Sequence, residues 1–116
     1  MAPGTDGSLA LYTERVFSEL AVRLAQKSPT AQEVRAFTRL FYGRAQRVEL
    51  DRQGRVRVPQ ELSELVSLGT ESVLIGVGDH VELWNSKKWD AYQADQQHRY
   101  DEIAETAFEG KPQDST

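Results

Sequence analysis

The chain has no cysteine and only two histidines, His80 and His98, among its 116 residues. Without cysteine it can form no disulfide, no thiolate nucleophile and no zinc site with cysteine ligands. The histidines lie too far apart in the sequence to suggest a local pair of metal ligands, and neither has a nucleophile and a carboxylate spaced around it. We therefore expect surface or packing roles for both, and no metal, no cofactor and no enzymatic activity.

Long apolar runs are also missing. None approaches the roughly 18 residues that a membrane-spanning helix needs, and the first residues lack the basic and apolar regions of a signal peptide. With 39% hydrophobic and 28% charged residues, the composition is that of one soluble globular domain. We expect a cytoplasmic protein without a membrane partner.

Basic residues are outnumbered, and the formal net charge of −4 disfavours polyanion binding by the molecule as a whole. The bases are nevertheless concentrated, because residues 35–57 contain seven arginines and only two acidic side chains. The seven are Arg35, Arg39, Arg44, Arg47, Arg52, Arg55 and Arg57. Arginine can hold phosphate or guanine with two parallel hydrogen bonds, which lysine cannot. The segment is therefore either a nucleic-acid face or a solubilising surface whose arginines pair with the acidic C-terminal third.

The N-terminal third predicts a strand followed by a helical hairpin. Residues 1–8 are rich in glycine, proline and hydroxyl side chains, so we expect a flexible leader there. Residues 9–12 form a short apolar segment of strand type. Apolar residues then recur at helical spacing over 14–27 and again over 30–43. These two stretches predict two helices joined by a short turn.

Capping signals mark the starts of both helices. Thr13 stands immediately before the first helical stretch, where its hydroxyl can accept a backbone N–H. Thr30 and Glu33 match the T-x-x-E capping box and predict the start of the second helix.

Beyond residue 43 the apolar period changes from 3.6 to 2, which is typical of strands. We expect β-hairpins over 46–58 and 72–84, with a short helix over 61–66 between them. The run over 72–77 is almost continuously apolar, which indicates a strand covered on both faces. Helices and strands occupy separate stretches, which predicts the α+β fold class.

The C-terminal residues predict one long helix and a polar tail. Ser86 is placed to cap the helix, and we expect residues 110–116 to be disordered. The aromatic residues of this region have spacings that favour core packing over stacking on nucleic-acid bases. They are Trp84, Trp89, Tyr92 and Tyr100.

The connection within the first predicted hairpin, residues 51–54, has the composition of a tight turn. Asp51 stands at the first turn position, where its carboxylate can accept backbone N–H groups, and Gly54 stands where a positive φ is expected. We therefore assign Asp51 and Gly54 to the structure of the turn.

Three segments in one order carry a resemblance to a known family. VELDRQGRVRVP at 48–59, the helix over 61–66 and VLIGVGDHVELW at 73–84 closely resemble one repeat of the MraZ family of bacterial transcription regulators. The spacing of Trp84 and Trp89 agrees as well, and the resemblance covers about residues 9–105. Family members have two such repeats, and this chain contains only the second, so it resembles an N-terminally truncated or degenerate MraZ protein.

The resemblance implies a specific version of the α+β fold. It implies half of a swapped-hairpin β-barrel of the SpoVT-AbrB type, preceded by the helical hairpin and followed by the long C-terminal helix. The expected division is a flexible leader (1–8), a remnant strand with the helical hairpin (9–43), a SpoVT-AbrB-like domain with the C-terminal helix (44–109) and a disordered tail (110–116).

The resemblance also implies a function. MraZ-type regulators bind short direct repeats in double-stranded DNA upstream of a division and cell-wall gene cluster, as ring-shaped oligomers, which would place this protein at the nucleoid. Arg55 is the family's turn arginine, and with Arg52 it would project towards a major groove and read guanine. Arg47 and Arg57 alternate onto the same outward face and would hold phosphates.

Two other functions fit the same residues. The chain could be an interaction module that assembles with itself or with a full-length paralogue and binds no DNA. It could also be an antitoxin-like member of the AbrB superfold, which binds a partner protein with its tail and DNA with its hairpins. Steep salt dependence of DNA binding would separate the regulator from the interaction module, because counterion release accompanies only the former.

Overall fold

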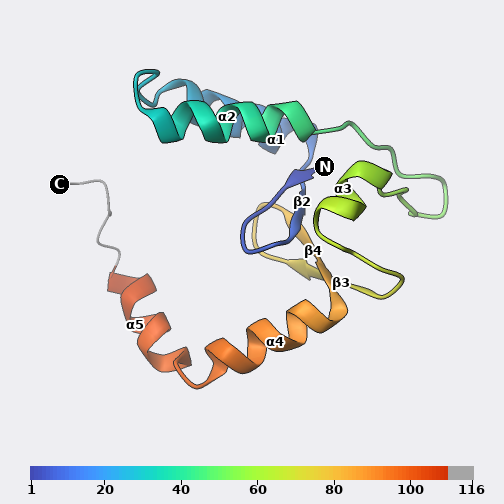
Figure 1. The fold of residues 1–116 in the computed structure, drawn as a ribbon, viewed down its shortest axis with the longest axis vertical. Coiled ribbons are helices and arrows are strands. Elements are labelled where there is room, and N and C mark those ends of the chain that lie inside the picture. The colour runs from blue at the N-terminus through green and yellow to red at the C-terminus, as the bar shows by residue number, and fades with distance from the viewer. Residues whose placement is uncertain (110–116) are drawn as a thin grey trace. The chain divides into compact units, whose positions relative to one another are not determined.

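The computed structural model describes residues 1–109, which divide into two units, Met1–Ser86 and the segment that begins at Lys87 (Figure 1). In chain order the elements are β1 (Ala2–Pro3), β2 (Leu9–Leu11), α1 (Glu14–Ala25), α2 (Gln32–Arg44), α3 (Gln60–Leu65), β3 (Ser72–Gly76), β4 (Val81–Asn85), α4 (Ser86–Gln97) and α5 (Tyr100–Glu109).

The first unit contains one antiparallel sheet with the strand order β1-β2-β4-β3. Leu9 of β2 and Leu74 of β3 lie opposite Leu83 of the central strand β4 on its two sides. β3 and β4 form the hairpin predicted over 72–84, and the Val77 N–H closes it by donating to the His80 carbonyl at 3.0 Å. Antiparallel strands and separate helices confirm the α+β class.

The core lies where the sheet meets α3. Leu9, Leu62 and Leu83 are at most 4% exposed, and Met1, Val66 and Leu68 complete the buried cluster. Val48 and Val58, which belong to the connection between α2 and α3, pack against this cluster from outside. Both ends of that connection are therefore attached to the core.

The first helix of the helical hairpin begins as predicted, but the turn between its two helices differs from the prediction. The Thr13 hydroxyl accepts the Val16 N–H at 3.1 Å, which confirms this cap of α1. The predicted capping box is wrong, because α2 begins at Gln32 without a side-chain cap. The Thr30 hydroxyl lies 2.8 Å from that of Ser28 and so serves the turn between the helices instead.

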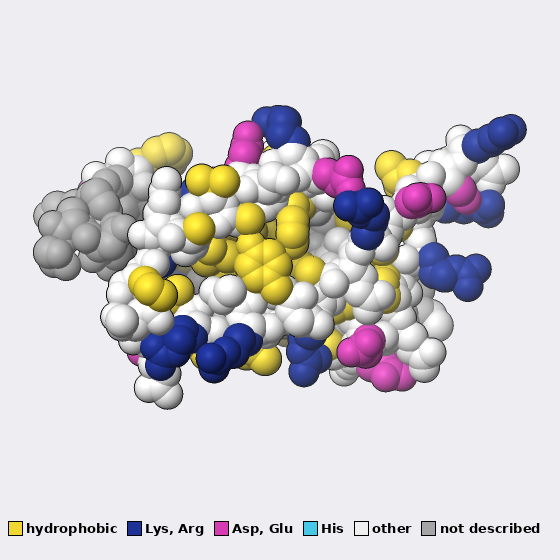
Figure 2. Space-filling model, turned by 90° about the horizontal axis from the view of Figure 1, so that it is seen from above, with side chains coloured by type: hydrophobic (Ala, Val, Ile, Leu, Met, Phe, Trp, Pro, Cys, Tyr) yellow, Lys and Arg dark blue, Asp and Glu magenta, His cyan; other side chains and the backbone are white. Residues whose placement is uncertain are grey.

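Aromatic side chains hold the hairpin together. Phe17 of α1 stacks on Phe41 of α2 with ring centroids 5.6 Å apart, and Tyr12 contacts both rings edge-on. Seen from above, hydrophobic side chains gather on the outer surface of this region (Figure 2). The large hydrophobic residues that the hairpin leaves exposed are Val22, Phe37, Leu40 and Tyr42.

Residues 1–8 differ from the expected flexible leader. Ala2 is fully buried and pairs with Ala10, and the Gly4 N–H donates to the Ser8 carbonyl at 2.9 Å. Asp6 and Gly7 have positive φ values, which lets the chain fold back tightly onto β2. The composition of residues 1–8 is typical of loops, but these residues form a tight turn, and Ala2–Pro3 adds a fourth strand to the sheet.

The predicted hairpin over 46–58 is reduced to its turn. Its two arms share a single β-bridge, between Leu50 and Val56, and no strand extends from it. Two-stranded ribbons are marginal unless a third strand or a packed face supports them, and Leu50 is 67% exposed. The alternating pattern is present, and Val48 and Val58 pack against the core, but Leu50 beside the turn is left uncovered.

Two further expectations, about the cover of β3 and about the C-terminal helix, are also corrected. β3 is an edge strand with alternating burial, and Leu74 is 66% exposed, so the strand is not covered on both faces. The C-terminal helix is two helices, because α4 ends at Gln97 and α5 begins at Tyr100. Trp84 is buried as expected, whereas Tyr100 is 64% exposed.

The disordered tail predicted for residues 110–116 lies outside the described residues. Within residues 1–109, no helix is both long and apolar enough to cross a membrane.

The packing of α3 predicts a contrast between two leucines of that helix. Leu62 is 1% exposed and Leu65 is 43% exposed. We expect Leu62→Ala to lower the free energy of unfolding by about 2–5 kcal/mol, as truncation of a buried leucine does, and Leu65→Ala to lower it by less than about 1 kcal/mol. Urea denaturation of both variants measures this, and equal losses would contradict the position of α3 over the core.

Candidate nucleic-acid interface

All four predicted site arginines lie on one connection, residues 45–59, which joins α2 to α3 and extends away from the sheet (Figure 1). Its two ends are attached to the core through Val48 and Val58. The four arginine side chains of this connection are all exposed; they are Arg47, Arg52, Arg55 and Arg57. We call this connection the arginine loop.

The tip of the arginine loop is a tight turn fixed by Asp51. The Asp51 Oδ1 accepts the backbone N–H groups of Gln53 at 2.9 Å and of Arg55 at 2.8 Å. The Gly54 N–H donates to the Asp51 carbonyl at 3.0 Å, and Gly54 has a φ of 80°. Glycine is the residue that adopts this left-handed conformation without strain. Asp51 and Gly54 thus lie in the turn positions that the sequence predicts.

Asp51 also forms an ion pair that the sequence analysis missed. Its Oδ2 accepts the Nε–H of Arg55 at 2.8 Å, while 74% of the Arg55 side chain remains exposed. The backbone N–H and the guanidinium of Arg55 hold the pKa of the Asp51 carboxyl below its ordinary value. The signal was present in the sequence, because a turn closed by Gly54 brings residues 51 and 55 side by side.

The other three arginines of the loop differ in their surroundings. Arg47 forms an ion pair with Glu14, the first residue of α1, at 3.0 Å, and both side chains are more than three-quarters exposed. Pairs as exposed as this exchange readily with solvent and contribute little to stability. Within residues 1–109, Arg52 and Arg57 form no ion pair. The loop therefore offers positive charge at several exposed points.

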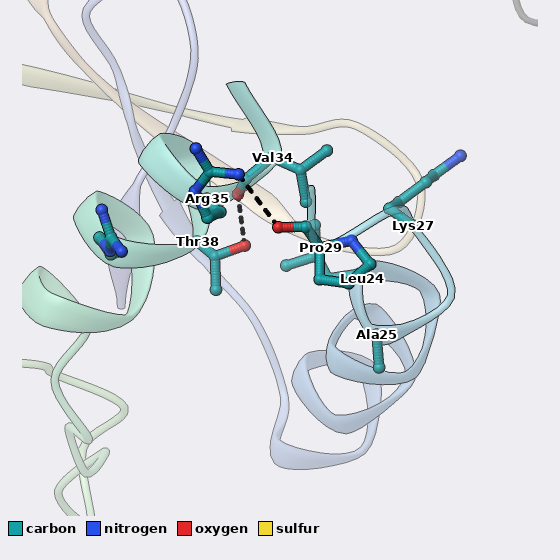
Figure 3. A pocket seen from close by; sticks show the side chains of 8 residues that line it. Leu24, Ala25, Lys27, Pro29, Val34, Arg35 and Thr38 are labelled. Carbon is teal, nitrogen blue, oxygen red and sulfur yellow. Dashed lines mark hydrogen bonds between the residues drawn. The ribbon is translucent and has the colours of Figure 1, made fainter. Parts of the chain in front are cut away.

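A separate groove of about 290 Å³ lies beside the turn between α1 and α2 (Figure 3). Leu24, Val34 and Pro29 form part of its wall, and the Nη1 of Arg35 donates to the Pro29 carbonyl at 3.2 Å. The residues that line it include no carboxylate and no histidine. The groove therefore has no pair of groups suited to acid–base chemistry.

His80 is a packing residue, as the sequence predicts. Its Nδ1 lies 2.8 Å from the Asp79 carboxylate and its ring lies 4.9 Å from that of Tyr12. The hydrogen bond from His80 holds the pKa of Asp79 below its ordinary value. Within residues 1–109, no group of histidine and acidic side chains is arranged to hold a metal ion.

The chemistry that this loop supports is recognition of anions and of hydrogen-bond acceptors. A guanidinium offers five N–H donors in a planar fork that matches phosphate oxygens or the O6 and N7 atoms of guanine. An exposed loop anchored at both ends can present such groups while its base stays rigid. These features fit a surface that contacts nucleic acid.

Comparison with known proteins agrees with this interpretation. Residues 41–111, which include the whole arginine loop, match the family model described as "MraZ protein, putative antitoxin-like". The chain is 39% identical to the transcriptional regulator MraZ of Alkaliphilus oremlandii over 104 residues, which are 90% of this chain and 73% of that protein. It is 34% identical to the MraZ regulator of Mesoplasma florum over 110 residues, which are 95% and 75% of the two chains. From the family model and these relatives, the chain belongs to the MraZ family of transcriptional regulators.

Proposed function

We propose that this protein is a DNA-binding transcriptional regulator that recognises short direct repeats upstream of a division and cell-wall gene cluster and acts as an oligomer. The observation that carries the proposal is the arginine loop, in which a turn fixed by Asp51 holds exposed guanidinium groups beyond the core. Binding of this kind would place the protein at the nucleoid.

The arginines of the loop divide into two roles in this proposal. Arg55 and Arg52 lie at the turn and would enter the major groove, where an arginine fork distinguishes guanine from the other bases. Arg47 and Arg57 lie on the arms and would contact phosphates, which fix orientation without reading sequence. Asp51 and Gly54 would keep the turn in shape.

Exposed apolar residues support the oligomeric part of the proposal. β3 is an edge strand of the sheet, where Leu74 is 66% exposed, and Leu50 in the arginine loop is 67% exposed. An edge strand with apolar side chains is a surface that proteins normally cover. Self-association through this edge would bury Leu74.

Two substitutions in the loop separate base reading from phosphate contact. We expect Arg55→Ala to weaken binding to the direct-repeat duplex by about 1–3 kcal/mol and to relax preference at one base pair. Arg57→Ala should weaken binding to all duplexes alike and reduce the slope of log K against log salt by about one. Fluorescence anisotropy titrations at several salt concentrations, with repeat and scrambled duplexes, measure both effects.

The matched control is Arg15→Ala, which removes the same charge from α1, where Arg15 is paired with Glu19 at 3.2 Å. This variant should bind DNA like the unmodified protein. Equal, sequence-independent losses for Arg55→Ala and Arg57→Ala would reduce Arg55 to a phosphate contact. No loss for either variant would contradict DNA binding through this loop and favour the interaction module.

The exposed sheet edge predicts association in solution. At tens of micromolar, an order of magnitude at which standard-sized interfaces hold, light scattering should give a mass that is a multiple of the 13.1 kDa chain. Leu74→Glu places a charge on the edge and should shift the protein to smaller species. The same substitution at Val22, which is exposed on α1, serves as the control. A monomer at this concentration would refute the oligomeric proposal.

A further inference from the structure

The ion pair between Asp51 and Arg55 leaves one end of the guanidinium available. The Nε of Arg55 is occupied by Asp51 Oδ2 at 2.8 Å, whereas Nη1 and Nη2 have no hydrogen-bond acceptor within residues 1–109. These two groups form the end of the planar fork, and they are the pair that a bidentate contact with guanine O6 and N7 can use. The free end belongs to a side chain that is 74% exposed.

The carboxylate that holds Arg55 is itself held by the backbone. Asp51 Oδ1 accepts two backbone N–H groups, at 2.9 and 2.8 Å, so the second oxygen has a fixed position relative to the turn. An arginine side chain alone has many rotamers, and fixing one of them before binding reduces the entropy lost on complex formation. The turn and the guanidinium plane are thus set by the two oxygens of one side chain.

The charge balance of the pair favours base reading over phosphate attraction. The Asp51 carboxylate pairs with the Arg55 guanidinium at 2.8 Å, so the two side chains together carry almost no net charge. Such a neutral pair attracts phosphate weakly, but Nη1 and Nη2 of Arg55 can still donate hydrogen bonds in a fixed direction. Arg52 and Arg57 have no such carboxylate within residues 1–109 and retain the full charge that phosphate contacts use.

We propose that Asp51 is a positioning residue for sequence recognition: it orients Arg55 so that Nη1 and Nη2 meet a guanine in the major groove. The inference rests on the proposed DNA-binding function and gives Asp51 a role beyond the turn. It makes an unusual prediction, because removing a negative charge from a DNA-binding loop is then unfavourable for specific binding.

The substitution Asp51→Asn tests this role. The asparagine Oδ1 can still accept both backbone N–H groups, whereas its amide nitrogen cannot accept the Nε–H of Arg55. We expect binding to the direct-repeat duplex to weaken roughly tenfold, the loss of one directed base contact, while the melting temperature changes little. If Asp51 acts only through its charge, the same variant should instead bind all duplexes more tightly.

Duplexes in which 7-deazaguanine replaces each guanine of one repeat in turn provide the direct readout, since this base lacks N7. The unmodified protein should bind more weakly when one or two particular guanines are replaced. The Asp51→Asn protein, which already lacks the contact, should lose little further affinity on the same duplexes. An Asp51→Asn protein that keeps both the affinity and the sensitivity to 7-deazaguanine of the unmodified protein would overturn the inference.

Arg55→Lys keeps the positive charge, removes the forked guanidinium and leaves Asp51 unchanged. It therefore tests the same contact even if Asp51→Asn disturbs the turn. The losses caused by Asp51→Asn and Arg55→Lys should not add in the double variant, because both remove the same contact. Additive losses would overturn the inference. If the unmodified protein fails to prefer the repeat duplex over a scrambled one, the proposed function itself fails, and that result is read before any variant is compared.

Discussion

The rest of the structure depends on the contact between α3 and the sheet, where Leu62 packs with Leu9 and Leu83. Because these side chains are almost fully buried, they fix the place where the arginine loop begins and ends. Val48 and Val58 join the same cluster from the two arms of the loop. A short connection attached at both ends has little freedom at its base, so the geometry of its tip is decided by local hydrogen bonds. The turn at Asp51 supplies them.

Features that neighbouring residues decide could be predicted from the sequence. The Thr13 cap, the hairpin of β3 and β4 and the turn closed by Gly54 all depend on contacts within a few positions of the chain. The exposure of Arg47, Arg55 and Arg57 also follows from their alternation with valines. For the same reason, the candidate site could be located from the sequence, although the ion pair between Asp51 and Arg55 was missed.

Features that depend on distant partners were missed. Ala2 and Pro3 form a strand because Ala2 pairs with Ala10 and the carbonyl of the buried Met1 accepts the Gln46 N–H at 2.8 Å, and composition cannot indicate such pairing. The pair between Arg47 and Glu14 joins a loop to a helix that is far away in the sequence. The hairpin predicted over 46–58 does not form because part of it lacks a covering partner. Its alternating pattern is adequate, but a ribbon needs a covering surface along its length, and the core covers Val48 and Val58 at the base while Leu50 near the tip stays exposed.

The net charge of −4 raises the question of how such a protein approaches DNA. At physiological ionic strength, charges separated by more than about 8 Å of solvent are largely screened from one another. A phosphate at the arginine loop therefore responds mainly to the loop, where Arg52 and Arg57 keep their charge, and little to acidic residues elsewhere. Pairing Arg55 with Asp51 lowers the charge that Arg55 offers to phosphate and, in the proposed role, sets the direction of its remaining donors. An acidic protein that must choose one site among many gains more from directed donors than from additional positive charge, because uniform attraction strengthens every site alike.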